Sequence, residues 1–449
     1  MRKFKWILPA LLVAWAQRTA VAPPPYLGTK TPYVAPAGGY TPVPAGYRPL
    51  FVNYAGRHGA RFLTKAGSDS GALKVLELSA AERGLTPLGQ RIRAAVKRLC
   101  LIEKGRYENI TLLGAAEQRA IGQRMLGRYP GVFRGRGLDV AVTFKVRTRQ
   151  SADAFIGGLT GYRGVTHFSR AADSLDAVLR FYDLSPAYLK YKKSGMVRNG
   201  MDSVDRDPRT AAVAAAVNER LFTAGFLVRR TAAESLAFSD DLYDLYSVQY
   251  SLPGEIRQRG WVLDSVDVSA AFSREDLVWE DFRSGAQDFL EKGPGRDPLG
   301  IQVKVAAPLL GDFIRTTDEA VAAEGKTGGM SGRGRDAVLR FTHAEAISPF
   351  ASLLGIPEAS VPAAGIRQYH DHWQAERIIP LSANIQWIIY GNGERTLVKI
   401  LLNEREVLLP LSGGPYYSWK ELRFYCMQRM KAAQAGLEED MVAYLKGLR

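Results

Sequence analysis

The residues with the clearest chemical capacity are Arg57-His58-Gly59-Ala60-Arg61, which follow the short apolar run 49–54. Such a run predicts a buried strand, and ligands of open α/β sheets bind at the carboxyl ends of strands. Two guanidinium groups can each hold a pair of phosphate oxygens and offset the charge of a transition state. A histidine between them is placed to attack phosphorus, and Gly59 lets the backbone approach a ligand closely. The pentapeptide therefore predicts phosphoryl transfer.

A second motif, Thr342-His343-Ala344-Glu345, lies between a predicted strand, 336–341, and a predicted helix, 344–354. A strand-to-helix turn presents both polar side chains at the same edge of the sheet as His58. His343 can hold a phosphate oxygen beside the amides of the helix N-terminus. Glu345 can protonate a departing alkoxide, which is a poor leaving group without a general acid.

Two alternatives involve the segment 370–372. His370-Asp371 is also a histidine–acid pair, but no apolar strand precedes it, so we favour His343 and Glu345. His370 and His372 stand at alternate positions that could ligate a metal. The sequence shows no third ligand, and we therefore predict a polar loop and no metal.

The pentapeptide is the RHGxR signature of the histidine phosphatase superfamily, and the chain resembles the acid phosphatase and phytase branch. His-Ala-Glu in place of His-Asp resembles the multiple inositol-polyphosphate phosphatases, of a bacterial type. Other stretches are similar to that group, so that the resemblance spans roughly residues 50–410: 179–183, 343–355, 379–384 and 401–404.

The resemblance implies that His58 forms a phosphohistidine and that Glu345 donates the proton, with no metal or organic cofactor. It implies phosphate binding by Arg57, Arg61, Arg147, His343 and Thr64. Arg149 competes with Arg147 in the same loop, and we favour Arg147 for its four-residue spacing to Ser151.

The implied reaction is hydrolysis of inositol polyphosphates such as phytate, with a broad acid phosphatase or sugar phosphatase as the alternative. The formal net charge of +15 attracts anionic ligands of many kinds. A non-catalytic polyanion-binding protein is disfavoured because lysine and arginine are scattered rather than gathered in one stripe, and we expect neither nucleic acid nor membrane as partner. Candidates for holding further phosphates of the substrate are Arg180 and the group Lys190, Lys192 and Lys193.

The pattern of elements predicts an α/β fold, with a mostly parallel sheet flanked by helices and a helical cap. The resemblance implies a phosphoglycerate mutase-like core. Thr86-Pro87 is typical of a helix start, and Ser418 with Glu421 predicts a capping box for the last helix. The predicted helices are 87–101, 112–129, 344–354 and one beginning at Ser151, and the predicted strands are 49–54, 138–146, 301–306, 336–341, 385–390, 396–402 and 406–409.

We predict a signal peptide at 1–16, where Arg2, Lys3 and Lys5 precede an apolar run too short to span a bilayer. Its removal after Ala16 would leave a charge of +12 and a secreted or periplasmic protein. A Pro/Gly-rich leader at 17–49 precedes a phosphatase core at 50–165 and 301–449, and the helical cap covers 166–300. Cys100 and Cys426 are too far apart in sequence for their pairing to be inferred.

Overall fold

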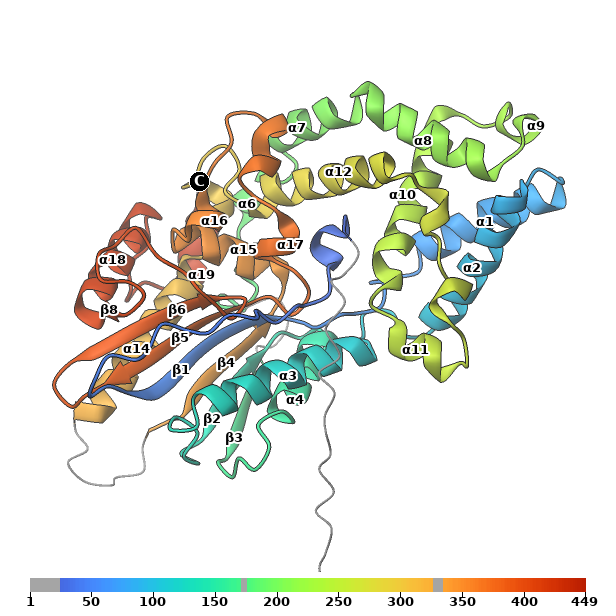
Figure 1. Ribbon diagram of the computed structural model, residues 1–449. Coiled ribbons are helices and arrows are strands. Elements are labelled where there is room, and N and C mark those ends of the chain that lie inside the picture. Colours follow the sequence, from blue (N-terminus) through green and yellow to red (C-terminus); the bar gives the residue numbers. More distant parts are fainter. Residues whose placement is uncertain (1–24, 171–175, 326–333) are drawn as a thin grey trace, which may run out of the picture.

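The computed structural model describes residues 25–170, 176–325 and 334–449, so the predicted signal peptide lies outside the described residues. The described strands form one eight-stranded sheet of order β3-β2-β4-β1-β5-β6-β7, with β8 paired to β6 (Figure 1). The strands β1 to β4 are mutually parallel, and β5 to β8 add an antiparallel half. The predicted α/β fold class is confirmed. The bounds are β1 Arg48–Arg57, β2 Leu138–Val142, β3 Thr166–Arg170, β4 Ala337–Thr342, β5 Asn384–Gly391, β6 Thr396–Leu402, β7 Arg405–Glu406 and β8 Tyr417–Ser418.

Helices cover both faces of the central strands, which explains why β4 and β5 are buried at every position. On one face, α3 (Leu112–Arg128) and α4 (Val146–Ile156) pack on Tyr54 and Phe341. On the other face, α14 (Ala307–Gly325), α15 (Ala344–Leu353) and α18 (Trp419–Ala432) pack around Trp387 of β5, and Phe350 of α15 belongs to the same core. A strand that is buried on both faces has a nearly continuous apolar sequence, and this pattern made these strands predictable.

A helical region lies beside the sheet, and its long helices are α1 (Ser68–Ala81), α2 (Pro87–Glu103), α8 (Pro208–Leu221), α10 (Ala232–Gln249) and α12 (Arg274–Lys292) (Figure 1). Here α10 packs on α8 and α1, and α2 packs on α1 and α8. The helical region is therefore larger than the predicted cap of residues 166–300, because it includes α1 and α2. The strand β3, at the start of that range, belongs to the sheet instead. The shorter helices are α5 Phe181–Leu184, α6 Pro186–Tyr191, α7 Gly195–Asp205, α9 Ala224–Leu227, α11 Pro253–Gln258, α13 Ile301–Lys304, α16 Pro357–Ser360, α17 Ala375–Ile378 and α19 Met441–Gly447, with 3₁₀ turns η1 Gly28–Lys30, η2 Leu263–Ser265, η3 Ser269–Ala271 and η4 Ile366–Asp371.

Several local predictions were wrong. Residues 301–304 form the short helix α13 and 305–306 form a turn, so the segment is not extended. The buried Gln302 turns back to donate to Pro294 O and Asp297 O at 3.0 and 2.8 Å. A strand with one polar face would have left that amide in solvent. The helix expected from Ser151 begins at Val146, since β2 ends four residues earlier than predicted. Ser418 does precede α18, but its side chain makes no capping bond, so the predicted capping box is absent.

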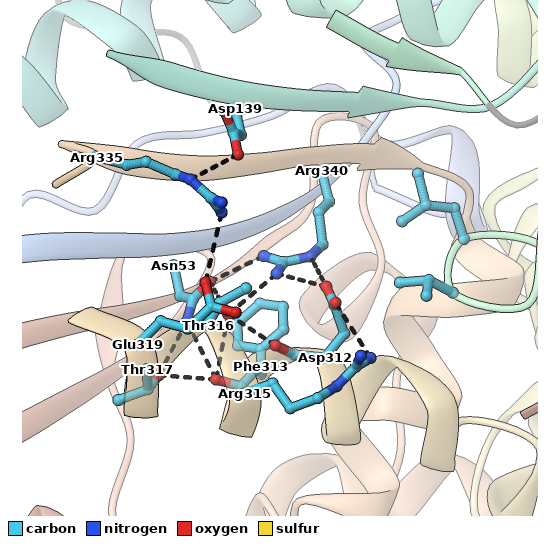
Figure 2. Close-up of polar contacts among 12 residues, drawn as sticks. Asn53, Asp139, Asp312, Phe313, Arg315, Thr316, Thr317, Glu319, Arg335 and Arg340 are labelled. Carbon is cyan, nitrogen blue, oxygen red and sulfur yellow. Dashed lines mark hydrogen bonds and ion pairs between the residues drawn. The ribbon is translucent and has the colours of Figure 1, made fainter. Parts of the chain in front are cut away.

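A buried polar network fixes β1 and β4 to α14 (Figure 2). The guanidinium of Arg340 on β4 donates to Asp312 Oδ2 at 2.6 Å, to Asn53 Oδ1 at 2.9 Å and to Thr316 Oγ1 at 3.2 Å. Asn53 lies on β1, so the network joins the two strands whose carboxyl ends carry His58 and His343. Arg340 is 1% exposed, and its partners satisfy the hydrogen-bonding groups that burial removes from water.

The described part of the predicted leader runs along the folded chain and makes specific contacts. Gly28 N donates to Asp281 on α12, and Tyr33 Oη donates to Glu404 beyond β6. Cys100 and Cys426 are free, so they form no disulfide with each other. None of the described helices is both long and apolar enough to cross a membrane.

Candidate active site

His58 follows β1 directly, at the edge of the sheet where β1 and β4 end together. Arg57 on β1 pairs with Thr342 on β4, and His58 N donates to Thr342 O at 3.0 Å. This register places the rings of His58 and His343 with their centroids 5.5 Å apart. Two histidines 285 positions apart in the sequence thus meet because parallel strands end at one edge.

The orientation of the His58 ring leaves one nitrogen ready to attack. Nδ1 lies 3.0 Å from Gly59 O, and since a carbonyl oxygen only accepts, Nδ1 carries the proton. Nε2 therefore keeps its lone pair. Burial, with further contributions from Arg57 and Arg147, holds the pKa of His58 well below its usual range. The neutral, nucleophilic form is the one that this environment favours.

The turn after His58 is held tightly against α3. A Cβ at Gly59 would lie 2.5 Å from Gly114 O, so only glycine fits this approach. Gly59 N donates to Ser151 Oγ at 3.0 Å, and Ala60 N donates to Glu117 Oε2 at 2.9 Å. The backbone of the loop is thereby fixed from α3 and α4.

Three arginines supply buried donors around His58. The Nε groups of Arg57, Arg61 and Arg147 are buried without a hydrogen-bond partner among the described residues. Burial lowers the pKa of Arg57 and that of Arg61 to about 10, and Arg147 contributes to the lowering in both cases. Buried, unpartnered guanidinium donors are costly unless a ligand satisfies them, and a phosphate dianion has the matching charge and oxygens.

Arg57 is aimed by two backbone carbonyls. Its Nη1 donates to Thr29 O at 2.7 Å and to Ile379 O at 2.5 Å. The predicted leader therefore takes part in the site. Arg149, the competitor of Arg147, is exposed, pairs with Asp153 at 2.9 Å and covers the ring of Phe168, so it points away from the cluster.

His343 and Glu345 begin α15 at the end of β4. His343 is buried, and its Nε2 lies 3.0 Å from Thr143 Oγ1 and 3.4 Å from Arg180 Nη1. The Glu345 side chain is 39% exposed, and Lys292 Nζ lies 3.5 Å from it. Burial raises the pKa of Glu345, but Lys292 and His343 outweigh that effect and hold it well below the usual range. Glu345 is thus an anion until a ligand changes its surroundings.

Residues 56–403 match the histidine phosphatase superfamily (branch 2). The chain belongs to this family. Multiple inositol polyphosphate phosphatase 1 of Gallus gallus is 22% identical over an alignment of 423 residues, and the match covers 89% of this chain and 89% of that one. The structure of Bifidobacterium longum multiple inositol polyphosphate phosphatase, in complex with inositol hexasulfate, is similar with a TM-score of 0.73 and 23% identity, covering 89% of this chain and 96% of that one. The phytase from D. castellii is similar with a TM-score of 0.63 and 16% identity, covering 93% and 89%.

Some residues of this histidine phosphatase site were not singled out from the sequence. Lys292 at the end of α12 is one, and no sequence signal marks it, because only packing brings α12 to α15. The sequence predicts Arg180 only as a residue that holds further phosphates of the substrate, whereas in the structure it contacts His343. Thr64 is exposed in the loop after Arg61, and no described contact joins it to the other predicted site residues.

Proposed function

We propose that this histidine phosphatase hydrolyses phosphomonoesters of inositol polyphosphates, such as phytate, through a phosphohistidine on His58. The observation that carries the proposal is the set of buried, unpartnered arginine donors around a neutral imidazole. This arrangement suits a dianion that receives an in-line nucleophile. The named inositol polyphosphate phosphatase relatives support the choice of substrate.

In the first step the lone pair of His58 Nε2 forms the N–P bond while the ester P–O bond breaks. The electron pair leaves with the alkoxide oxygen, which takes a proton from Glu345. Glu345 must therefore be protonated when substrate is bound. The negative charge of an incoming phosphate raises the pKa of a neighbouring carboxyl group, which reverses the effect of Lys292.

In the second step a water oxygen bonds to phosphorus, and the P–N electron pair returns to His58. Glu345, now a carboxylate, accepts the proton from that water. The arginines, together with His343, hold the phosphate oxygens in both steps. Their fixed positive charge supplies what a metal ion supplies in other phosphatases, so the chemistry needs none.

The test is rapid quenching with labelled phytate, which should trap an acid-labile, alkali-stable phosphoenzyme. His58→Ala should remove both the adduct and phosphate release while the protein stays folded. His167→Ala is the matched control, because His167 is exposed on β3 and should leave both unchanged. An alkali-labile adduct, or an adduct that persists in His58→Ala, would refute the nucleophile. Faster turnover of glucose phosphates than of phytate would indicate a general acid phosphatase instead.

The proposal also places the enzyme outside the cytosol, either secreted or periplasmic. The basic residues and apolar run within 1–16 support this. Sequencing the N-terminus of protein recovered from the periplasm or medium should show a start at Gln17. Recovery only from the cytosol, with residues 1–16 intact, would contradict export.

A further inference from the structure

Three possible metal ligands meet outside the active site, in three elements that are separate in the sequence. They are Asp281 on α12, His370 in η4 and Glu376 on α17, and one ligand atom from each lies within 4.8 Å of the others. Asp281 is buried, while His370 and Glu376 are half-buried. Both η4 and α17 pack on α12, so the cluster lies between packed elements rather than within one loop.

Hydrogen bonds within the cluster do not account for the arrangement. Asp281 Oδ1 accepts from Gly28 N at 2.8 Å, and Oδ2 forms a loose ion pair with His370 Nε2 at 3.9 Å, a distance longer than that of a hydrogen bond. No other described residue donates to that oxygen or to the Glu376 carboxylate. The Asp281 side chain is only 7% exposed, and one of its carboxylate oxygens lies within 4.8 Å of one ligand atom from each of the other two residues.

The orientation of His370 is constrained by neighbouring rings. The imidazole lies perpendicular to Tyr369, with centroids 5.8 Å apart, and against Phe282 at 6.5 Å. These contacts aim Nε2 at Asp281. A cation between the three residues would offset the charge of both carboxylates and accept the imidazole nitrogen as a ligand.

We propose that Asp281, His370 and Glu376 form a structural binding site for a divalent transition metal, for which Zn²⁺ is the best match. One imidazole nitrogen with two carboxylate oxygens suits Zn²⁺, whereas Ca²⁺ and Mg²⁺ select oxygen ligands alone. Tetrahedral Zn²⁺ places its ligand atoms about 3.4 Å apart, so the 3.9 Å pair needs to close by about 0.5 Å and no pair of the three by more than about 1.4 Å. The fourth position would hold water.

The site would stabilise the part of the chain that supports Arg57. Asp281 already holds Gly28 in η1, and Glu376 lies three residues before Ile379. The carbonyls that orient Arg57 belong to Thr29 and Ile379. A metal joining α12 to α17 would therefore fix both carbonyl-bearing segments, without contacting the phosphate. The inference is independent of the proposed substrate.

The experiment measures Zn²⁺ binding by the full-length, metal-stripped protein, using calorimetry and thermal unfolding. One equivalent should bind, and zinc at a hundredfold excess over its Kd should raise the Tm by roughly 3–5 °C. His370→Ala should weaken binding by more than about tenfold, and the isosteric Glu376→Gln should do the same. Because Glu376 is half-exposed, Glu376→Gln keeps the test valid should His370→Ala fail to fold.

His372→Ala is the matched control, since His372 is exposed two residues away and should leave zinc binding unchanged. Equal affinity in His370→Ala and His372→Ala would overturn the site. An absence of stoichiometric zinc binding would also overturn it. Loss of the zinc-dependent rise in Tm in His58→Ala would do the same, because it would place the ion in the active site. Replacement by Co²⁺ should give visible absorption typical of a four-coordinate site, and that absorption should vanish in Glu376→Gln.

Discussion

Glu117 is the buried carboxylate that anchors the loop carrying His58, and Glu117→Gln should lower both stability and turnover. Its oxygens accept three hydrogen bonds, from Tyr33 N at 2.9 Å, Ala60 N at 2.9 Å and Ser382 Oγ at 2.7 Å. These donors lie in the leader, in the loop that follows His58 and in the loop before β5. One side chain thus joins three segments beneath the site.

The magnitude follows from the donors that the amide cannot satisfy. Glutamine keeps one oxygen, and the Ser382 hydroxyl can rotate to accept from the new amide group. The backbone N–H of either Ala60 or Tyr33 then faces the glutamine NH₂ group, which is itself a donor, and is left without an acceptor. A buried donor without a partner costs about 1–3 kcal/mol, so the free energy of unfolding should fall by about 2 kcal/mol. A small displacement of His58 should lower kcat by about 10- to 100-fold, with a smaller change in KM.

Chemical denaturation and steady-state kinetics on phytate measure the two effects. Glu77→Gln is the matched control, because Glu77 pairs with Arg93 and Lys97 on the surface, where such pairs contribute about 0–1 kcal/mol. It should leave kcat unchanged. The reasoning about the loop fails if Glu117→Gln unfolds within about 0.5 kcal/mol of wild type and retains its kcat.

Three further predictions concern charge. Because the pKa of His58 is lowered in the folded state, that state binds fewer protons than the unfolded state. The free energy of unfolding of wild type should therefore fall relative to that of His58→Ala as the pH drops below about 6.5, by up to about 1.4 kcal/mol per pH unit. Parallel curves of unfolding free energy against pH would contradict this. Glu345→Gln should slow alkyl phosphates far more than nitrophenyl phosphate, whose leaving group needs no proton, and equal losses would exclude Glu345 as the general acid. For phytate, kcat/KM should fall more steeply with added salt than for a monophosphate, because the proposed mature chain, with a formal charge of +12 after removal of residues 1–16, attracts the more highly charged ligand. Similar slopes in an ionic-strength series would argue against that preference.

The sequence could predict the parts of the site that follow strands. His58 and His343 each come directly after an apolar run, and parallel strands of one sheet bring their carboxyl ends together. The four-residue spacing to Ser151 favours Arg147 over Arg149, and in the structure Arg147 lies in the buried cluster while Arg149 is exposed. These predictions required only the local sequence pattern and the rule that parallel strands bring their carboxyl ends to the same edge of the sheet.

Other parts depend on packing that no local pattern records. Lys292 reaches Glu345 because of how α12 packs on α15, and Glu117 lies in the middle of a helix with no motif around it. Thr64 was chosen by its distance from Arg61 in the family pattern, but the loop there leaves it exposed. The alternating apolar residues at 301–306 resembled a strand, since the burial of Gln302 cannot be seen in the sequence.

The contact between η1 and the rest of the chain bears on when the enzyme can become active during synthesis. Gly28 is paired with a residue 253 positions later, and Tyr33 with one 371 positions later. Because a ribosome releases the N-terminus first, neither of these two contacts can form until most of the chain has emerged. The closure of such distant contacts comes late in folding. The carbonyl of Ile379, which helps to orient Arg57, likewise emerges late, so an unfinished chain would lack part of the proposed phosphate site.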